Sequence, residues 1–185
     1  MPTAPSSRPL ARGARRLLGS PSAAFLSFLF LASILTLGGK QLHAMSGGAP
    51  KLDFLWSAPP EAYLEALSRY GAAGRALFFR LNVVDMLFPL NVAWLGGLLL
   101  TRAFRTPGWL PLVPLAFALL DLIENLLFFR MLRAWPDFST TLASVCAVVT
   151  TAKLAALGLS YALMLAALLR LGLRRWGSRR DGIHP

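Results

Sequence analysis

Residues 119–130 read LLDLIENLLFFR, and this short stretch decides how the rest of the chain is interpreted. Eight of its twelve residues are aliphatic or aromatic, yet Asp121, Glu124 and Asn125 stand in their midst. On a helix these three positions are spaced i, i+3 and i+4, so they project from one side. The stretch therefore predicts an apolar helix that carries one polar stripe.

The apolar character extends over most of the chain. Of the 185 residues, 56% are hydrophobic and only 15% are charged, whereas a typical soluble domain carries about a quarter charged residues. The mean hydropathy is +0.57. The apolar residues gather in four blocks, each long enough for the roughly 20 residues with which a helix crosses a bilayer. These blocks are residues 22–39, 76–101, 110–132 and 141–171.

The four blocks predict an all-α fold, in which residues 22–173 form a single four-helix transmembrane bundle. Between spans 1 and 2, residues 59–70 predict a short amphipathic extracytoplasmic helix, because Tyr63, Leu67 and Tyr70 recur at helical spacing. We expect this helix to lie on the outer membrane surface or to cap the bundle.

The formal net charge of +11 could indicate nucleic acid, but the basic residues lie beside the predicted spans. If the four helices are threaded in order, the two tails and the connection after the second span fall on one side. The cytoplasmic face attracts Lys and Arg, so we predict a multi-pass protein of the cell membrane with both termini cytoplasmic. Residues 1–21 form a basic tail that we expect to be disordered, and residues 174–185 form a second basic tail. The expected partner is the lipid bilayer and not nucleic acid. The arginines on this side are Arg8, Arg12, Arg15, Arg16, Arg102, Arg105, Arg170, Arg174, Arg175, Arg179 and Arg180.

A cleaved signal peptide is an alternative interpretation of the first block, because a basic start precedes an apolar stretch at residues 23–37. Against it, Lys40 follows directly, and the nearest small-x-small sequence, at residues 47–49, lies far past the apolar stretch. Cleavage would leave three spans and would place the two termini on opposite sides of the membrane.

Two further spans carry polar stripes. In the second span, Asn82 and Asp85 are spaced i, i+3, and in the fourth, Thr150 and Lys153 share one stripe. The first span offers only hydroxyl groups. Pro89 follows Asp85 by four residues, so it removes a backbone hydrogen bond near that carboxyl and predicts a kink.

The energetic cost of isolated charges in the bilayer predicts that these polar stripes face one another. Each isolated charge near the bilayer centre costs at least about 2.5–3.5 kcal/mol on insertion scales. An arrangement that faces the charges inward and pairs Lys153 with carboxylates is cheaper. Because three acids then face one base, at least one carboxyl is protonated, or the site holds a cation or a cationic ligand. The candidate catalytic groups are Asp85, Asp121, Glu124 and Lys153, and the candidate binding groups are Asn82, Asn125 and Thr150.

The sequence lacks the residues that several kinds of catalytic and metal-binding sites require. His43 and His184 are the only histidines, and neither lies within a predicted span, so we expect neither a Ser-His-Asp triad nor a metal site in the membrane. There is no Gly-rich phosphate loop with its lysine. The single cysteine, Cys146, excludes a disulfide within the chain. We expect no metal and no cofactor.

Three functions remain open, and the sequence does not decide whether the protein is an enzyme. Slightly preferred is a structural or accessory membrane subunit, as a homo-oligomer or beside a partner subunit. The second is an intramembrane acid–base enzyme acting on a small or lipid-like substrate, with Lys153 as the electrostatic partner of the carboxyls. The third is a proton- or cation-coupled transporter that uses the same residues.

Overall fold

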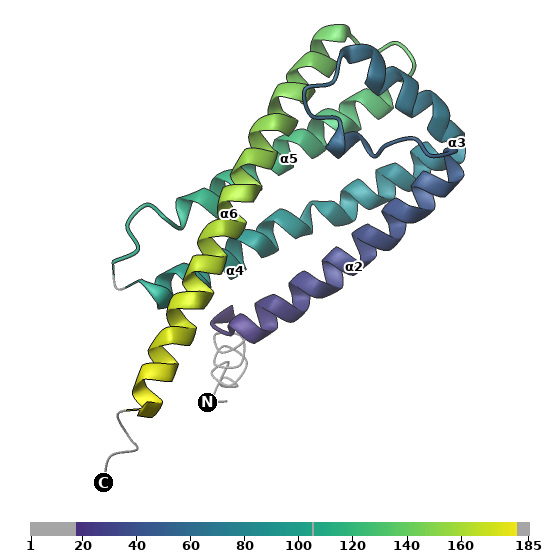
Figure 1. The fold of residues 1–185 in the computed structure, drawn as a ribbon. Helices are drawn as coiled ribbons and strands as arrows, with labels where there is room; N and C mark the ends of the chain where they lie inside the picture. Colours follow the sequence, from purple (N-terminus) through teal and green to yellow (C-terminus); the bar gives the residue numbers. More distant parts are fainter. Residues whose placement is uncertain (1–17, 105, 181–185) are drawn as a thin grey trace, which may run out of the picture.

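The structure is a computed structural model and describes residues 18–104 and 106–180 (Figure 1). In this part of the chain every regular element is a helix, which confirms the predicted all-α bundle. The elements are α2 (Pro21–Met45), the short 3₁₀ helix η1 (Leu52–Phe54), α3 (Pro60–Asp85), α4 (Leu87–Ala103), α5 (Leu112–Arg133) and α6 (Thr140–Arg180).

Four helical stretches among the described residues are long and apolar enough to cross a membrane. Side chains exposed along them include Leu26, Leu119 and Val148, which is the surface that lipid tails require. The chain is therefore a polytopic membrane protein. The four stretches are Pro21–Met45, Pro60–Ala103, Leu112–Arg133 and Thr140–Arg174.

The helices run alternately up and down, so that α2 begins and α6 ends at the same end of the bundle (Figure 1). We call this end the terminal end, and we call the opposite end, where residues 46–59 and 134–139 lie, the loop end. Helix α5 packs against α4 and α6, whereas α2 packs against α3 and α4. Helices α2 and α6 do not pack closely on each other.

The second span is interrupted in its middle. Helix α3 ends at Asp85, and α4 begins at Leu87. Pro89 has no N–H to donate to the carbonyl of Asp85, so the helical ladder cannot continue unchanged. The kink predicted from Pro89 is present as this interruption, beside the Asp85 carboxyl.

Residues 60–70 form the first part of α3, and we call them the cap helix. Gly71, with φ 61° and ψ −177°, breaks the helix after them in a conformation that is nearly restricted to glycine. Tyr63 and Tyr70 are buried, and their hydroxyls donate to the carbonyls of Leu55 (3.0 Å) and Pro50 (2.7 Å). The predicted amphipathic helix therefore caps the bundle and holds the loop of residues 46–59.

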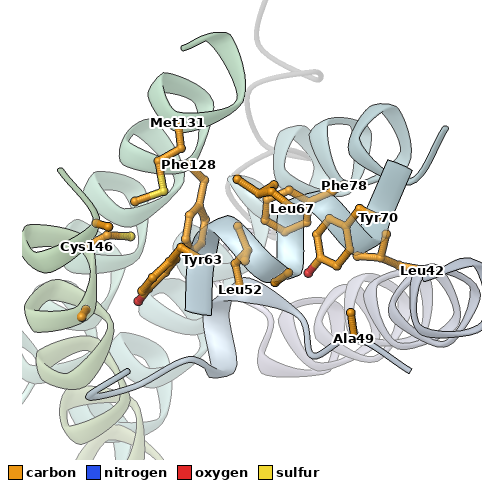
Figure 2. Close-up of a cluster of buried hydrophobic side chains, with 13 residues drawn as sticks. Leu42, Ala49, Leu52, Tyr63, Leu67, Tyr70, Phe78, Phe128, Met131 and Cys146 are labelled. Carbon is orange, nitrogen blue, oxygen red and sulfur yellow. The ribbon is translucent and has the colours of Figure 1, made fainter. Parts of the chain in front are cut away.

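Two apolar cores fill the two ends of the bundle. The loop-end core, shown in Figure 2, joins the cap helix to the other helices through residues such as Tyr63, Phe78 and Phe128. The terminal-end core includes Val92 and Phe117. Along each of these spans, the buried polar residues of α3, α5 and α6 come after residues of one core and before residues of the other. We call these polar residues the polar layer. Its members are Asn82, Asp85, Asp121, Glu124, Asn125, Thr150 and Lys153.

Glycines fix the register between α2 and α3. A Cβ atom at Gly38 would lie 2.2 Å from Leu81 Cδ2, and one at Gly74 would lie 3.5 Å from Leu42 Cδ1. In this antiparallel register Asp85 lies at the level of residues 31–34 of α2. The Asp85 carboxyl is thus placed well inside the bundle and not at its surface.

Candidate functional site

A network of buried charges joins α5 to α6. The Lys153 ammonium forms an ion pair with Glu124, and it lies 3.3 Å from Asp121 Oδ1. The Thr150 hydroxyl donates to the other carboxylate oxygen of Glu124. The four residues are at most 4% exposed, so water contributes little to their solvation and they depend on one another.

The spacing within each helix explains why these groups meet. Asp121 and Glu124 are three residues apart on α5, and Thr150 and Lys153 are three residues apart on α6, so each pair occupies one stripe. The neighbouring residues Ile123 and Val148 are exposed at the same level, on the surface that faces lipid. When α5 and α6 pack side by side with their apolar faces outward, the two polar stripes face each other.

The two buried amides differ in what they do. Asn125 donates its side-chain N–H to Asp121 Oδ2 over 3.1 Å and also interacts with Asp85. Asn82 is buried, but its side-chain nitrogen finds no hydrogen-bond partner among the described residues, although the sequence led us to expect it to support the cluster. A shared stripe fixes the face on which Asn82 lies, but it does not bring a partner within reach.

Asp85 is the carboxyl of the polar layer that lies at the edge of the network, to which Asn125 connects it. It is 6% exposed, and among the residues that the structure describes it forms no ion pair. Its side chain lines a cavity, together with Asp121 and Lys153. The three acids and the one base are thus brought to one place, with Lys153 engaged by two of the acids.

The cavity has a volume of about 660 Å³ and lies between α2 and α6, within the size range of sites that bind small molecules. Thr36 and Lys40 of α2 and Tyr161 of α6 line it and are exposed, so the cavity reaches the surface between these two helices. Much of this surface belongs to membrane-spanning segments, so a molecule dissolved in the bilayer has access to the cavity from the side.

The walls of the cavity change in character along its length. Toward the terminal end the lining residues are apolar or aromatic, including Leu35, Phe88 and Leu157. Phe28 packs beside this part through ring contacts with two lining residues, Phe88 (5.5 Å between centroids) and Tyr161 (6.4 Å). Toward the loop end the cavity meets charged side chains, so it has one apolar and one polar part.

Four lining residues, Pro50, Lys51, Asp53 and Phe54, come from the loop, and none of them was among the candidates from the sequence. Lys51 and Asp53 form an ion pair of 2.6 Å over the loop end of the cavity. Burial disfavours the charged ammonium of Lys51, but the carboxylates of Asp53 and Asp85 outweigh this effect and raise the pKa of Lys51. No periodic pattern marks these residues, because the hydrogen bonds of Tyr63 and Tyr70 determine where the loop lies.

Within residues 18–104 and 106–180, no three His, Cys, Asp or Glu side chains converge in a way that could hold a metal ion. Comparison with known proteins found no matching family model, no matching curated protein and no matching solved structure. The chemistry of the site is therefore inferred from its own residues.

Proposed function

We propose that this protein binds a lipid-like amphiphile from the bilayer in the cavity between α2 and α6. The observation that carries the proposal is the position of Asp85, a buried carboxyl without an ion pair, at the wall of a cavity that opens between two membrane-spanning helices. The apolar part of the cavity suits a hydrocarbon or ring system, and the polar layer suits a headgroup. Sites of this kind, with apolar walls and a few convergent polar groups, are typical of small-molecule binding.

The rest of the polar layer supports a structural role for its own members. Glu124, Thr150 and Lys153 satisfy one another and connect α5 to α6, as a network that locks a bundle would do. Asp85 forms no ion pair with that network, although Asn125 connects it to Asp121. A purely structural or accessory subunit gives no reason for an open cavity at this carboxyl. The geometry therefore favours a binding site that is supported by a structural network.

Transport receives less support from the geometry. Below the cavity, the terminal-end core packs α2, α4, α5 and α6 together through apolar side chains such as Ala24, Val92 and Met164. A proton or ion on its way from the polar layer to the terminal end would have to cross this core, where bare charges are costly.

Proton transfer to or from the bound amphiphile is a second candidate function. Asp85 and Asp121 line the same cavity, but only Asp121 is paired with Lys153. Two carboxyls in unequal environments are the arrangement that acid–base enzymes use. In deuterated water, such an enzyme would exchange a carbon-bound hydrogen of the amphiphile for deuterium, and Asp85→Asn would abolish this incorporation. Binding of the amphiphile without deuterium incorporation would support the binding function and contradict the proton-transfer function.

A photoreactive long-chain alcohol in phosphatidylcholine vesicles tests the binding site directly. We expect labels on α2 around residues 32–39 and on α6 around residues 154–161. Gly39 lines the cavity and a Cβ there meets no atom, so Gly39→Trp should fill the cavity and remove these labels. Gly97, where a Cβ also meets no atom, lies outside the lining, so Gly97→Trp should leave them unchanged. Labels that are spread over lipid-facing residues such as Ile123, and equal in both variants, would contradict the proposal.

A further inference from the structure

The charges around the cavity indicate which headgroup it accepts. Lys153, the lysine of α6 in the cavity wall, is already engaged by Glu124 and Asp121. At the loop end, Lys51 is engaged by Asp53. Asp85 is buried, faces the cavity and forms no ion pair among the described residues. It interacts electrostatically with Lys51 and Lys153, but both ammonium groups are already paired with other carboxylates. In this part of the described chain, Lys51 and Lys153 thus face four carboxyls (Asp53, Asp85, Asp121 and Glu124), and Asp85 is the one that forms no ion pair.

We propose that the cavity binds a cationic amphiphile, with a protonated amine against Asp85 and an apolar body between α2 and α6. This inference rests on the proposed function and adds the charge of the ligand to it. The ammonium would form a direct ion pair with Asp85, which Lys51 and Lys153 do not form, and its N–H groups would donate to the carboxylate as a charge-assisted hydrogen bond. Burying a carboxylate without an ion-pair partner costs free energy, so a ligand that supplies this partner gains binding free energy.

The aromatic lining supports the same ligand class. Phe88 follows Asp85 by three residues on the kinked span, and Phe117 precedes Asp121 by four residues on α5, so each ring shares a helix face with a cavity carboxyl. Both rings line the cavity. Ring faces attract ammonium groups and also pack against hydrocarbon, so an amine beside Asp85 finds favourable surroundings on both counts.

The order of charges along the cavity disfavours a zwitterionic phospholipid. Lys40 and His43, which are exposed at the cavity's rim, lie closer to the loop end than Asp85 does. In the α2–α3 register, Asp85 lies at the level of residues 31–34, which is about 10 Å deeper than Lys40 at 1.5 Å per residue. A phospholipid carries its phosphate deeper than its ammonium, which is the reverse of this order. A single amine on an apolar body fits the site better.

The test uses the full chain in phosphatidylcholine nanodiscs at neutral pH, with binding to empty nanodiscs subtracted. Three radiolabelled probes share one chain length and differ in charge: dodecylamine, dodecanol and dodecanoate. We expect the native protein to bind the amine at least about tenfold more tightly than the alcohol, because hydrogen bonds to charged groups are worth about 1.5–3 kcal/mol. We expect the carboxylate to bind more weakly than the alcohol.

The variant Asp85→Asn keeps the shape of the side chain and removes its charge. We expect it to bind dodecanol as the native protein does, which shows that the cavity is intact, and to lose the preference for the amine. Glu65→Gln is the matched control, since it removes one carboxyl from an exposed position of the same helix. It should leave the preference unchanged.

Other results separate the two proposals. Equal binding of the amine and the alcohol, or a preference that survives Asp85→Asn, would overturn the cationic ligand but leave amphiphile binding in place. Tightest binding of dodecanoate would also overturn it and would assign recognition to the basic residues at the rim, Lys40 and His43. If none of the three probes binds above the empty nanodiscs, the proposed function fails as well.

Discussion

Lys153 illustrates how a single side chain can decide whether neighbouring helices fit together in a membrane. Its ammonium is shared by Glu124 and Asp121, which lie on another helix. Two carboxylates around one ammonium leave this group of three with an excess negative charge if all are ionised. The hydrogen bonds from Thr150 and Asn125 to the two carboxylates offset part of the cost, because they solvate oxygens that water does not reach.

Replacing Lys153 with Met should destabilise the bundle by about 3–5 kcal/mol, because it leaves buried carboxylates without their cation. Adding Glu124→Gln to this variant should restore part of the loss, since the amide still accepts from Thr150 and carries no charge. Reversible unfolding in mixed micelles measures both values. The control is Lys40→Met, an exposed lysine on α2, for which we expect a change within about 0.5 kcal/mol. Equal stability of the two lysine variants would show that the network contributes nothing.

At the scale of single elements, glycines determine how helices turn and how closely they approach. Gly71 separates the cap helix from the membrane-spanning part of α3, in a backbone conformation with positive φ. Gly38 allows α2 to lie directly against Leu81 of α3. The first glycine is needed for its backbone conformation and the second for its lack of a side chain.

Gly71→Ala should destabilise the protein by about 1–3 kcal/mol, because a Cβ is strained in that region of backbone space. The space around Gly71 is open, so the loss would come from the backbone and not from a clash. Thermal unfolding in detergent measures the effect. Gly39→Ala, in a regular helix with equally open space, should be neutral or slightly stabilising. If both variants unfold at the same temperature, the break at Gly71 is not required.

Gly38→Leu should push α2 away from α3, since even a Cβ at this position would meet Leu81 Cδ2. Overpacking of this kind costs about 1–3 kcal/mol. Gly158→Leu is the control, because a Cβ there meets no atom. Unfolding in mixed micelles compares the two, and limited proteolysis of the loop at residues 46–59 reports whether α2 has shifted. Identical behaviour of both variants would mean that Leu81 moves aside without cost.

The fold could be predicted from the sequence, because the signals for spans and stripes are local to each helix. The convergence of Asp121, Glu124 and Lys153 followed from the cost of isolated charges in hydrocarbon. The cavity could not be predicted in the same way, because it depends on α2 and α6 failing to pack closely, which no single helix encodes. Lys51 and Asp53 could not be predicted as cavity residues for a related reason. They lie in a loop without a periodic pattern, and the loop is held by tyrosines that come later in the sequence. The roles assigned to the polar residues stay predictions.

At the scale of the whole molecule, α2 begins and α6 ends at the same end of the bundle (Figure 1). If the four candidate spans of the described residues all cross the bilayer, this end lies on one side of it. Basic residues at this terminal end include Arg102, which donates to the carbonyl of Gly19, and Arg170, which lies over the ring of Phe104. The cytoplasmic face attracts such residues. We therefore propose that the terminal end is cytoplasmic and that the cap helix faces outward.

Cysteine labelling of intact cells tests this orientation. In a Cys146→Ala background, we expect a membrane-impermeant maleimide to label Glu61→Cys at the loop end but not Thr106→Cys at the terminal end; both positions are exposed. After the cells are permeabilised, both should react. Labelling of Thr106→Cys alone in intact cells would reverse the orientation.

The ion pair between α5 and α6 also constrains how the protein is made. Glu124 and Lys153 are 29 residues apart, and a ribosome produces the acid before the base. Left alone in the bilayer, α5 would hold two carboxyls at a cost of about 5–7 kcal/mol on insertion scales. The nascent chain escapes this cost if α5 waits at the translocon until Lys153 emerges, so that the two helices enter the lipid together as a hairpin.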